Sequence, residues 1–404
     1  MRSAVRFLLP PELEASAPPE TRGLRRDHVR LLLLDRDSGA VSHHRFDELP
    51  LLLEPGDLVV VNDSRTLPAS LPGRTAGGVP LEVRLAARGP SGGREGAPGR
   101  SPGEPAGAGG EVWAALPLGV PDDGHDPALV PTDARPPAPP LPVGERLTFT
   151  GGLTATVLGR HEEAPPLVWI AFDAGGERLA EALHRAGRPV RYAYVPRPWP
   201  LHHYQTLFAA APGSAEMASA GRPFTLQTVR ALRDRGIGLA TISLHAGLST
   251  YGDATVDRRF VPAEPYRVPE ATAAAVGRCR AAGGRVVAVG TTVVRALETA
   301  AAASTRPGAG TPPGAAAAGA VRAGAGAGVS RLRIGPGHRL LAVDGLVTGL
   351  HEPEASHLDL LGAFVRPEAL ERAYAAAVDA GYLWHEFGDV CLVLGHRGRP
   401  GEGP

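Results

Sequence analysis

Short apolar runs rich in Leu and Val recur along the chain and predict buried strands. Two of them lie near the start, at 28–34 and 57–62, and later ones lie at 239–244, 285–289, 340–347 and 391–394. Helical patterns are expected between the later runs, at 226–235, 270–282, 293–303, 358–365 and 368–379. Strands that alternate with helices indicate an α/β domain with a mostly parallel sheet.

The middle of the chain follows a different pattern. Five segments alternate between apolar and polar residues, or nearly so, with turn residues between them: 81–87, 111–116, 145–149, 153–160 and 167–172. This pattern predicts a small antiparallel barrel or sandwich, followed by a helix at 175–186. We therefore expect a β-barrel domain of residues 66–173, inserted into a discontinuous α/β catalytic-type domain of residues 1–65 and 174–398.

Three stretches are rich in Gly, Pro, Ala or Ser and poor in larger apolar residues: 88–110, 121–142 and 301–328. Such segments bury too little apolar surface to offset the entropy lost on ordering, so we expect flexible inserts.

Composition narrows the class of protein. The chain has 404 residues, of which 43% are hydrophobic and 21% charged, values typical of globular proteins. Cys279 and Cys391 are far apart and indicate neither a disulfide framework nor a zinc site. The residue four positions after His351 is Ala355, so the HExxH metal motif is absent and no metal is expected. No apolar run approaches the roughly 20 residues of a membrane span, and the start lacks a signal-peptide pattern. We expect a cytoplasmic monomer or weak homo-oligomer without a membrane partner.

Residues 204–251 contain the highest concentration of candidate catalytic and ligand-binding residues. Tyr204, Gln205 and a Gly-, Ala- and Ser-rich loop precede an apolar run that ends in His245 and Gly247. Small residues let backbone N–H groups approach a ligand, and parallel strands present side chains at their carboxyl ends. His245 suits proton transfer near neutral pH, although a lone histidine is more often structural.

A second junction follows the run that ends at Val289. Gly290, Thr291 and Thr292 open a helix, and such a junction presents N–H groups and hydroxyls to an anion or a ribose. A simple helix cap is the alternative. Arg295 and Glu298 are three residues apart and are expected to pair on the helix surface if they bind nothing else.

The formal net charge is zero, so RNA binding would require a local basic patch. The stretch before Tyr204 offers four arginines and three aromatic residues: Arg185, Arg188, Arg191, Arg197, Tyr192, Tyr194 and Trp199. Arginine contacts to phosphate, with aromatic stacking on unpaired bases, hold RNA loops. A solvated Pro-rich linker is the alternative interpretation.

Several collinear segments resemble the S-adenosylmethionine:tRNA ribosyltransferase-isomerase (QueA) family. They are Tyr-Gln-Thr at 204–206, the loop that ends in Ala220-Gly221 and Phe224-Thr225, Ser243-Leu244-His245, and the stretches 46–71, 283–298 and 334–394. The resemblance covers most of the chain outside the inserts. It implies a mostly parallel sheet domain, an open barrel like that of the family, with an inserted small antiparallel β-barrel.

The resemblance also implies an activity: transfer and isomerisation of the ribosyl unit of S-adenosylmethionine onto 7-aminomethyl-7-deazaguanine in a tRNA anticodon loop, giving epoxyqueuosine. S-adenosylmethionine is then a ribosyl-donor substrate. On this basis the catalytic candidates are His245, Tyr204 and Gln205. The candidates for binding S-adenosylmethionine are Ser219, Gly221, Thr225, Gly247, Gly290, Thr291, Thr292 and Arg295.

Three of the departures from the family pattern bear most on the activity. Pro223 stands where the family has a histidine, Gly349 replaces an asparagine, and Glu354 replaces a lysine. A reversed charge changes which anionic group can bind there. Two alternatives therefore stay open: a paralogue with a different acceptor, or a non-catalytic nucleoside-binding protein on the same scaffold.

Overall fold

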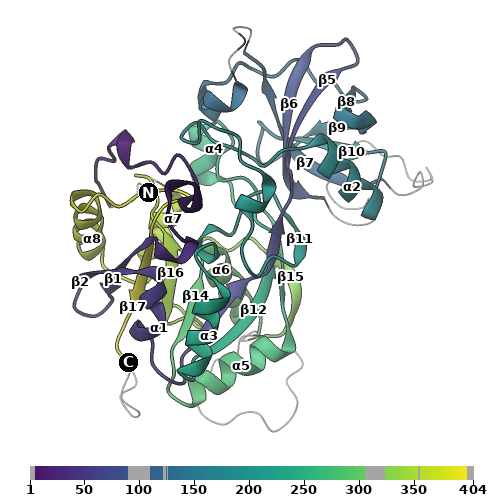
Figure 1. The fold of residues 1–404 in the computed structure, drawn as a ribbon. Coiled ribbons are helices and arrows are strands. Elements are labelled where there is room, and N and C mark those ends of the chain that lie inside the picture. Colours follow the sequence, from purple (N-terminus) through teal and green to yellow (C-terminus); the bar gives the residue numbers. More distant parts are fainter. Residues whose placement is uncertain are drawn as a thin grey trace, which may run out of the picture.

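The protein consists of a large mixed sheet flanked by helices and of a smaller closed β-barrel (Figure 1). The computed structural model describes residues 5–89, 110–121, 124, 126–304, 324–353 and 355–397. In Figure 1 the barrel, labelled β5 to β10, lies at one end of the molecule, and helix α5 lies at the other. None of the helices in the described ranges is both long enough and apolar enough to cross a membrane.

Nine strands form the main sheet: β1 (Arg30–Asp35), β2 (Val41–Arg45), β3 (Leu58–Asn62), β12 (Gly238–Leu244), β13 (Glu264–Val268), β14 (Val286–Val289), β15 (Gly326–Ser330), β16 (Gly345–Gly349) and β17 (Val390–Leu394). Their order is β15-β13-β12-β3-β14-β16-β17-β1-β2. The central neighbours β12, β3, β14 and β16 are parallel, and so are β17 and β1. The remaining pairs are antiparallel. The carboxyl ends of the four central strands therefore meet at one edge.

Helices cover both faces of this sheet. They are α1 (Leu49–Leu52), α3 (Leu226–Asp234), α5 (Glu270–Ala281), α6 (Thr291–Ser304), α7 (Ser356–Leu361) and α8 (Pro367–Asp379). In β3, Leu58 and Val60 pack with α5 to α8, whereas Val59 and Val61 pack with α1 and α3. Burial on both faces is why the strands read as continuous apolar runs.

The barrel is closed by six antiparallel strands: β5 (Ser70–Thr75), β6 (Pro80–Arg88), β7 (Val112–Gly119), β8 (Arg146–Phe149), β9 (Thr154–Arg160) and β10 (Val168–Phe172). Helix α2 (Gly176–Ala186) follows it and packs on its core, and α4 (Ala254–Arg259) contributes Val256 to the same core. Two short parallel strands, β4 (Ser64–Thr66) and β11 (Ala211–Ser214), lie beside the connection to the sheet. The predicted fold class, an α/β domain with a small antiparallel barrel, is confirmed.

The sequence patterns missed strands β2, β4, β5, β11, β13 and β15. Strand β15 begins at Gly326 and α6 continues to Ser304, so the ends of the predicted insert 301–328 are regular structure. The edge strand β15 needs only main-chain pairing with β13, which small residues allow. Residues 305–323 of this insert, and 90–109 of the insert 88–110, lie outside the described residues.

The stretch 121–142 contains short 3-10 helices at Pro127–Leu129 and Thr132–Ala134, although 122, 123 and 125 are not described. Arg135 in this stretch is buried and ion-paired with Glu82 of the barrel. The composition of this stretch did not indicate the packing, because the ion pair depends on Glu82, which is distant along the chain.

The strand predicted at 340–347 is also placed differently, because β16 begins only at Gly345. The preceding loop is held by Glu298, whose carboxylate accepts from the backbone N–H groups of Leu341 (2.8 Å), Ala342 (2.9 Å) and Val343 (3.2 Å). Glu298 is therefore not the surface partner of Arg295 that the spacing suggested.

Glu298→Ala is expected to lower the free energy of unfolding by about 3 kcal/mol, because it leaves three N–H groups in a mostly buried loop without their acceptor. Denaturant unfolding measures the change. Glu181→Ala, at an exposed position on α2, is the matched control and should change it by no more than about 0.5 kcal/mol. An equally small effect of Glu298→Ala would contradict the role given to this carboxylate.

Candidate active site

One buried amide joins the carboxyl ends of β3 and β12 to the start of α6. The Nδ2 atom of Asn62 donates to the Leu244 carbonyl (2.9 Å) and to Thr292 Oγ1 (3.3 Å). Its Oδ1 atom accepts from the N–H groups of Leu244 and Ser64, both at 3.0 Å. Asn62 therefore holds the end of β12, one residue before His245, at the start of α6.

The His245 imidazole is half-buried, and its Nδ1 lies 2.8 Å from the Ser64 hydroxyl. The Ser64 hydroxyl in turn bonds the hydroxyl of Ser214. Gly213 lies against the ring so closely that a Cβ there would come within 2.5 Å of Nδ1. Burial lowers the pKa of His245, the charge of Arg88 lowers it further, and Asp63 opposes this. The imidazole is therefore neutral at pH 7 and able to accept a proton.

The Gly290 turn lies next to the small-residue loop. Gly290 has φ +95°, a conformation that favours glycine, and a Cβ there would lie 3.7 Å from the Ala220 Cβ. Ala220 belongs to the 3-10 helix η9 (Ser219–Gly221). The fold thus brings together six of the predicted residues: His245, Ser219, Gly221, Gly290, Thr291 and Thr292. We call this group the strand-end site.

Other predicted residues have contacts that hold the scaffold. The Gln205 side chain pairs with the backbone of Thr66, accepting from its N–H (3.1 Å) and donating to its carbonyl (2.9 Å). Tyr204 is buried beside Phe387, and its carbonyl accepts from the Thr66 hydroxyl. Both residues therefore fix the position of β4, the strand that contains Ser64, which bonds His245.

The remaining three predicted residues lie further out. Thr225 caps α3 by accepting from Thr228 N–H (3.1 Å). Gly247 lies against the barrel, where a Cβ would come within 2.8 Å of the Ala86 carbonyl. Arg295 pairs with Glu264 of β13, and burial lowers its pKa to about 10.

Two carboxyl groups beside the strand-end site were missed by the sequence analysis. Glu216 accepts from the Tyr192 hydroxyl and from Ser249 N–H (2.8 Å), and Glu386 accepts from the Tyr194 hydroxyl. Burial raises the pKa of Glu216. Burial also raises the pKa of Glu386 to about 7, and the charge of Glu216 adds to the rise. A carboxyl group that titrates near neutrality suits general acid or base work.

The loop that carries Glu386 is strained. His385 has φ 70°, the one positive φ at a non-glycine position within the described ranges. Its ring stacks on Tyr194 with centroids 3.8 Å apart, and burial lowers its pKa to about 4. Such strain is concentrated at functional sites.

A small cavity connects this loop to the predicted ligand loop. Its lining includes Ser219, Pro223, Gly349, His385 and Glu386. Two of the three positions that depart from the family pattern, Pro223 and Gly349, therefore meet at one place. Glu354 lies outside the described residues. Just beyond β16, His351 bonds the Thr348 hydroxyl (2.8 Å) and stacks on His357 with centroids 4.4 Å apart.

The arrangement provides the neutral imidazoles of His245 and His385, a carboxyl group whose pKa is raised to about 7, and several hydroxyls at the ends of parallel strands. This set is suited to moving protons around a bound polar molecule. The alternation of Tyr192 and Tyr194 was visible in the sequence, but their carboxyl partners come from segments that are far apart along the chain.

One group of side chains with metal-ligand spacing lies away from the strand-end site. Among the described residues, Asp35, Asp37 and His396 are spaced to hold an ion, and Asp37 and His396 are exposed. An exposed acidic group is by itself no sign of a metal site, and the absence of a metal from the reaction stays a prediction.

Comparisons with known proteins give consistent matches. The model of the family described as queuosine biosynthesis protein matches residues 2–393. The S-adenosylmethionine:tRNA ribosyltransferase-isomerase of Gloeobacter violaceus is 36% identical over 98% of this chain and 95% of its own length. The enzymes of the same name from Moorella thermoacetica (35%) and Thermus thermophilus (34%) each match 96% of this chain and 98% of their own. A crystal structure of S-adenosylmethionine tRNA ribosyltransferase from Thermotoga maritima is 27% identical, covering 97% of this chain and 100% of its own, with a TM-score of 0.48.

Proposed function

The chain belongs to the family of queuosine biosynthesis proteins, and we infer that it is an S-adenosylmethionine:tRNA ribosyltransferase-isomerase. The observation that carries this conclusion is the match to enzymes of that name over nearly the whole length of both chains. S-adenosylmethionine is the ribosyl donor, and the acceptor is 7-aminomethyl-7-deazaguanine in tRNA. Adenine and methionine leave, and the ribosyl unit becomes an epoxycyclopentanediol.

We place the donor at the strand-end site as part of this proposal. In this proposal the ribose contacts Thr291 and Thr292 at the start of α6, and the loop at Ser219 and Gly221, which lies next to the Gly290 turn, borders the same space. Since Asn62 ties β3, β12 and α6 together, these contacts are fixed before a ligand binds. Such preorganisation lowers the cost of orienting the substrate.

Two residues take the proton transfers. The positive sulfonium makes the hydrogens on the adjacent C5′ carbon acidic, and the neutral imidazole of His245 accepts one of them. Adenine leaves more readily as a neutral molecule than as an anion. In this proposal the protonated carboxyl group of Glu386 therefore donates a proton to it as it leaves. Burial, with a smaller contribution from the charge of Glu216, raises the pKa of Glu386 to about 7 and so keeps part of its population protonated at neutral pH.

The direct test is incubation of the protein with S-adenosylmethionine and tRNA that carries the deazaguanine precursor, followed by chromatography of released adenine. Adenine release that requires both substrates is the expected result. No calorimetric binding of S-adenosylmethionine at millimolar concentration, together with no adenine release, would overturn the assignment.

One observation favours a second candidate, an enzyme of the same chemistry with a different acceptor. Pro223 and Gly349, which replace larger polar side chains of the family pattern, line the same cavity as Glu386. Gly349→Asn in combination with Glu354→Lys restores the family residues at two of the three positions. Full activity of the unmodified protein on the precursor tRNA would exclude this candidate, and activity gained only in the double variant would support it.

Gly213→Ala is expected to lower turnover at least tenfold, because the new Cβ occupies the space 2.5 Å from His245 Nδ1 and pushes the ring away from Ser64. The KM for S-adenosylmethionine should change less than kcat does. Gly277→Ala is the matched control, since nothing outside the neighbouring backbone of α5 lies within 4 Å of its new Cβ. Wild-type turnover in Gly213→Ala would show that the position of the imidazole is not critical.

A further inference from the structure

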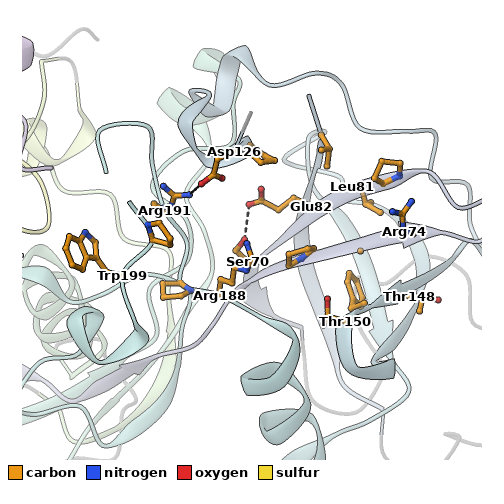
Figure 2. A pocket seen from close by; sticks show the side chains of 18 of the residues that line it. Ser70, Arg74, Leu81, Glu82, Asp126, Thr148, Thr150, Arg188, Arg191 and Trp199 are labelled. Atoms are coloured by element: carbon orange, nitrogen blue, oxygen red, sulfur yellow. Dashed lines mark hydrogen bonds and ion pairs between the residues drawn. The ribbon is translucent and has the colours of Figure 1, made fainter. Parts of the chain in front are cut away.

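A pocket of about 600 Å³ lies between the barrel and the segment 188–199, apart from the strand-end site (Figure 2). Its walls come from β5, β6 and β8 on one side and from Arg188, Arg191 and Trp199 on the other. Such a volume is typical of pockets that enclose a ligand of nucleotide size. The proposed chemistry at His245 and Glu386 assigns no role to this space.

Positive charge is concentrated around the pocket. Arg74, Arg188 and Arg191 line it, and Arg84 and Arg135 lie behind it. The negative groups are Glu82, which accepts from Arg84 Nε (2.7 Å) and Arg135 Nη1 (3.0 Å), and Asp126, which pairs with Arg191. In the lining itself three guanidinium groups stand against two carboxylates, in a chain whose formal net charge is zero, and Arg84 and Arg135 behind the wall both bind Glu82. The pocket is therefore suited to an anion.

Arg188 is free to bind that anion. Its backbone pairs with Ser70, which fixes its position at the barrel wall. Its side chain is exposed, and no partner of its guanidinium is found within the described part of the chain. Figure 2 shows that the neighbouring carboxylates are engaged elsewhere, Asp126 with Arg191 and Glu82 with Ser70.

The rest of the lining offers flat apolar surfaces. Besides Trp199 and Phe149, it contains several proline rings: Pro72, Pro80, Pro127, Pro189 and Pro198. The Thr148 and Thr150 hydroxyls lie at exposed positions of the wall. A cationic group beside rigid aromatic and proline faces is the chemistry that holds an unpaired nucleotide of RNA, phosphate and base together.

The pocket and the strand-end site share one wall. Arg188 and Arg191 line the pocket, whereas Tyr192 and Tyr194 of the same segment bond Glu216 and Glu386. The Arg84 guanidinium, whose Nε is bound to Glu82, lies 5.5 Å from the centroid of the Tyr192 ring. A strand of RNA that delivers its base to Glu386 can thus place a neighbouring nucleotide on the other side of this segment.

We propose that this pocket holds a nucleotide that flanks the modified base of the RNA substrate. The proposal rests on the proposed function for the identity of the RNA. Arg188 binds the phosphate of this nucleotide, and its base lies against the proline and aromatic faces.

The test measures fluorescence anisotropy of a stem-loop RNA that carries the acceptor base, without turnover. Arg188→Ala should raise the Kd about tenfold or more and reduce the slope of log K against log salt by about one. Arg278→Ala is the matched control, because Arg278 is exposed on α5 at the opposite end of the molecule. It should leave both the Kd and the slope unchanged.

A second variant locates the base. Thr150→Trp fills the pocket from its exposed wall, and stem-loops with one abasic nucleotide each are compared on both proteins. On the wild type, the RNA that is abasic at one flanking position should bind about tenfold more weakly than intact RNA. On Thr150→Trp, the same abasic RNA and intact RNA should bind equally well, because the pocket that would hold the missing base is already filled.

The possible results separate the two proposals. Wild-type affinity in Arg188→Ala and Thr150→Trp overturns the pocket assignment, even when adenine release confirms the enzyme. RNA binding that depends on Arg188 and on one flanking base supports the pocket, even when no adenine is released. Absence of RNA binding in the wild type overturns the pocket assignment, and adenine release then decides the enzyme independently.

Discussion

His245→Ala should reduce turnover by two to four orders of magnitude while changing the free energy of unfolding by only about 1 kcal/mol. The first figure is the usual contribution of a positioned general base. The second is the worth of one neutral hydrogen bond, the one between Nδ1 and the Ser64 hydroxyl. Adenine release and denaturant unfolding measure the two quantities on the same preparation.

His43→Ala is the control for this variant. His43 also bonds a single hydroxyl, that of Tyr382 at 3.0 Å, but it lies on the edge strand β2. Its replacement should leave turnover unchanged. If His245→Ala instead lost several kcal/mol of stability and retained activity, the imidazole would be a structural group.

The stability of the two proteins at acid pH provides a further test of His245. Because burial lowers the pKa of His245 below its value in the unfolded chain, the folded state binds this proton more weakly. The wild type should therefore lose stability as the pH falls below about 6.5. His245→Ala should lose less over the same range.

Glu386→Gln is expected to abolish most adenine release and to remove one limb of the pH profile. The protonated carboxyl group is the active form in the proposed step, so wild-type kcat should fall as the pH rises through about 7. Glutamine cannot supply a proton at any pH. A variant with wild-type kcat and the same falling limb would exclude Glu386 as the acid.

The same variant should be more stable than the wild type in alkaline buffer. Burial raises the pKa of Glu386, so folding disfavours the charged form, and this cost is complete above about pH 7 and absent below about pH 4. Glu386→Gln should thus gain at most about 3 kcal/mol at pH 8 and nothing at pH 4. Glu163→Gln, at an exposed ion pair with Arg331, should show neither effect.

The predictable part of the fold was the part with strong local patterns. Strands such as β3 are buried on both faces, so their apolar runs identify them, and small residues after β12 and β14 identify the strand ends. Strand β5 contains Pro72 and Gly73 and was missed, because its place in the barrel depends on pairing with β6 and β8.

The site was predictable only where neighbours in sequence act together. The sequence singles out His245 and the Gly290 turn because each follows an apolar run, and their roles stay predictions. Glu216 and Glu386 were not found, because what raises their pKa values is enclosure by segments from several parts of the chain. For Gln205, the position in a family motif suggested a catalytic role. In the structure its side-chain amide pairs with the backbone of Thr66.

The two edges of the main sheet bear on how the protein behaves at high concentration. Strand β2 carries His43, His44 and Arg45, and such polar groups discourage a second sheet from adding to it. The opposite edge, β15, is short and made mainly of glycine and alanine, with Val329 as its one exposed large apolar side chain. Self-association in storage would therefore begin at β15, and a lysine at position 329 is the single change best placed to prevent it.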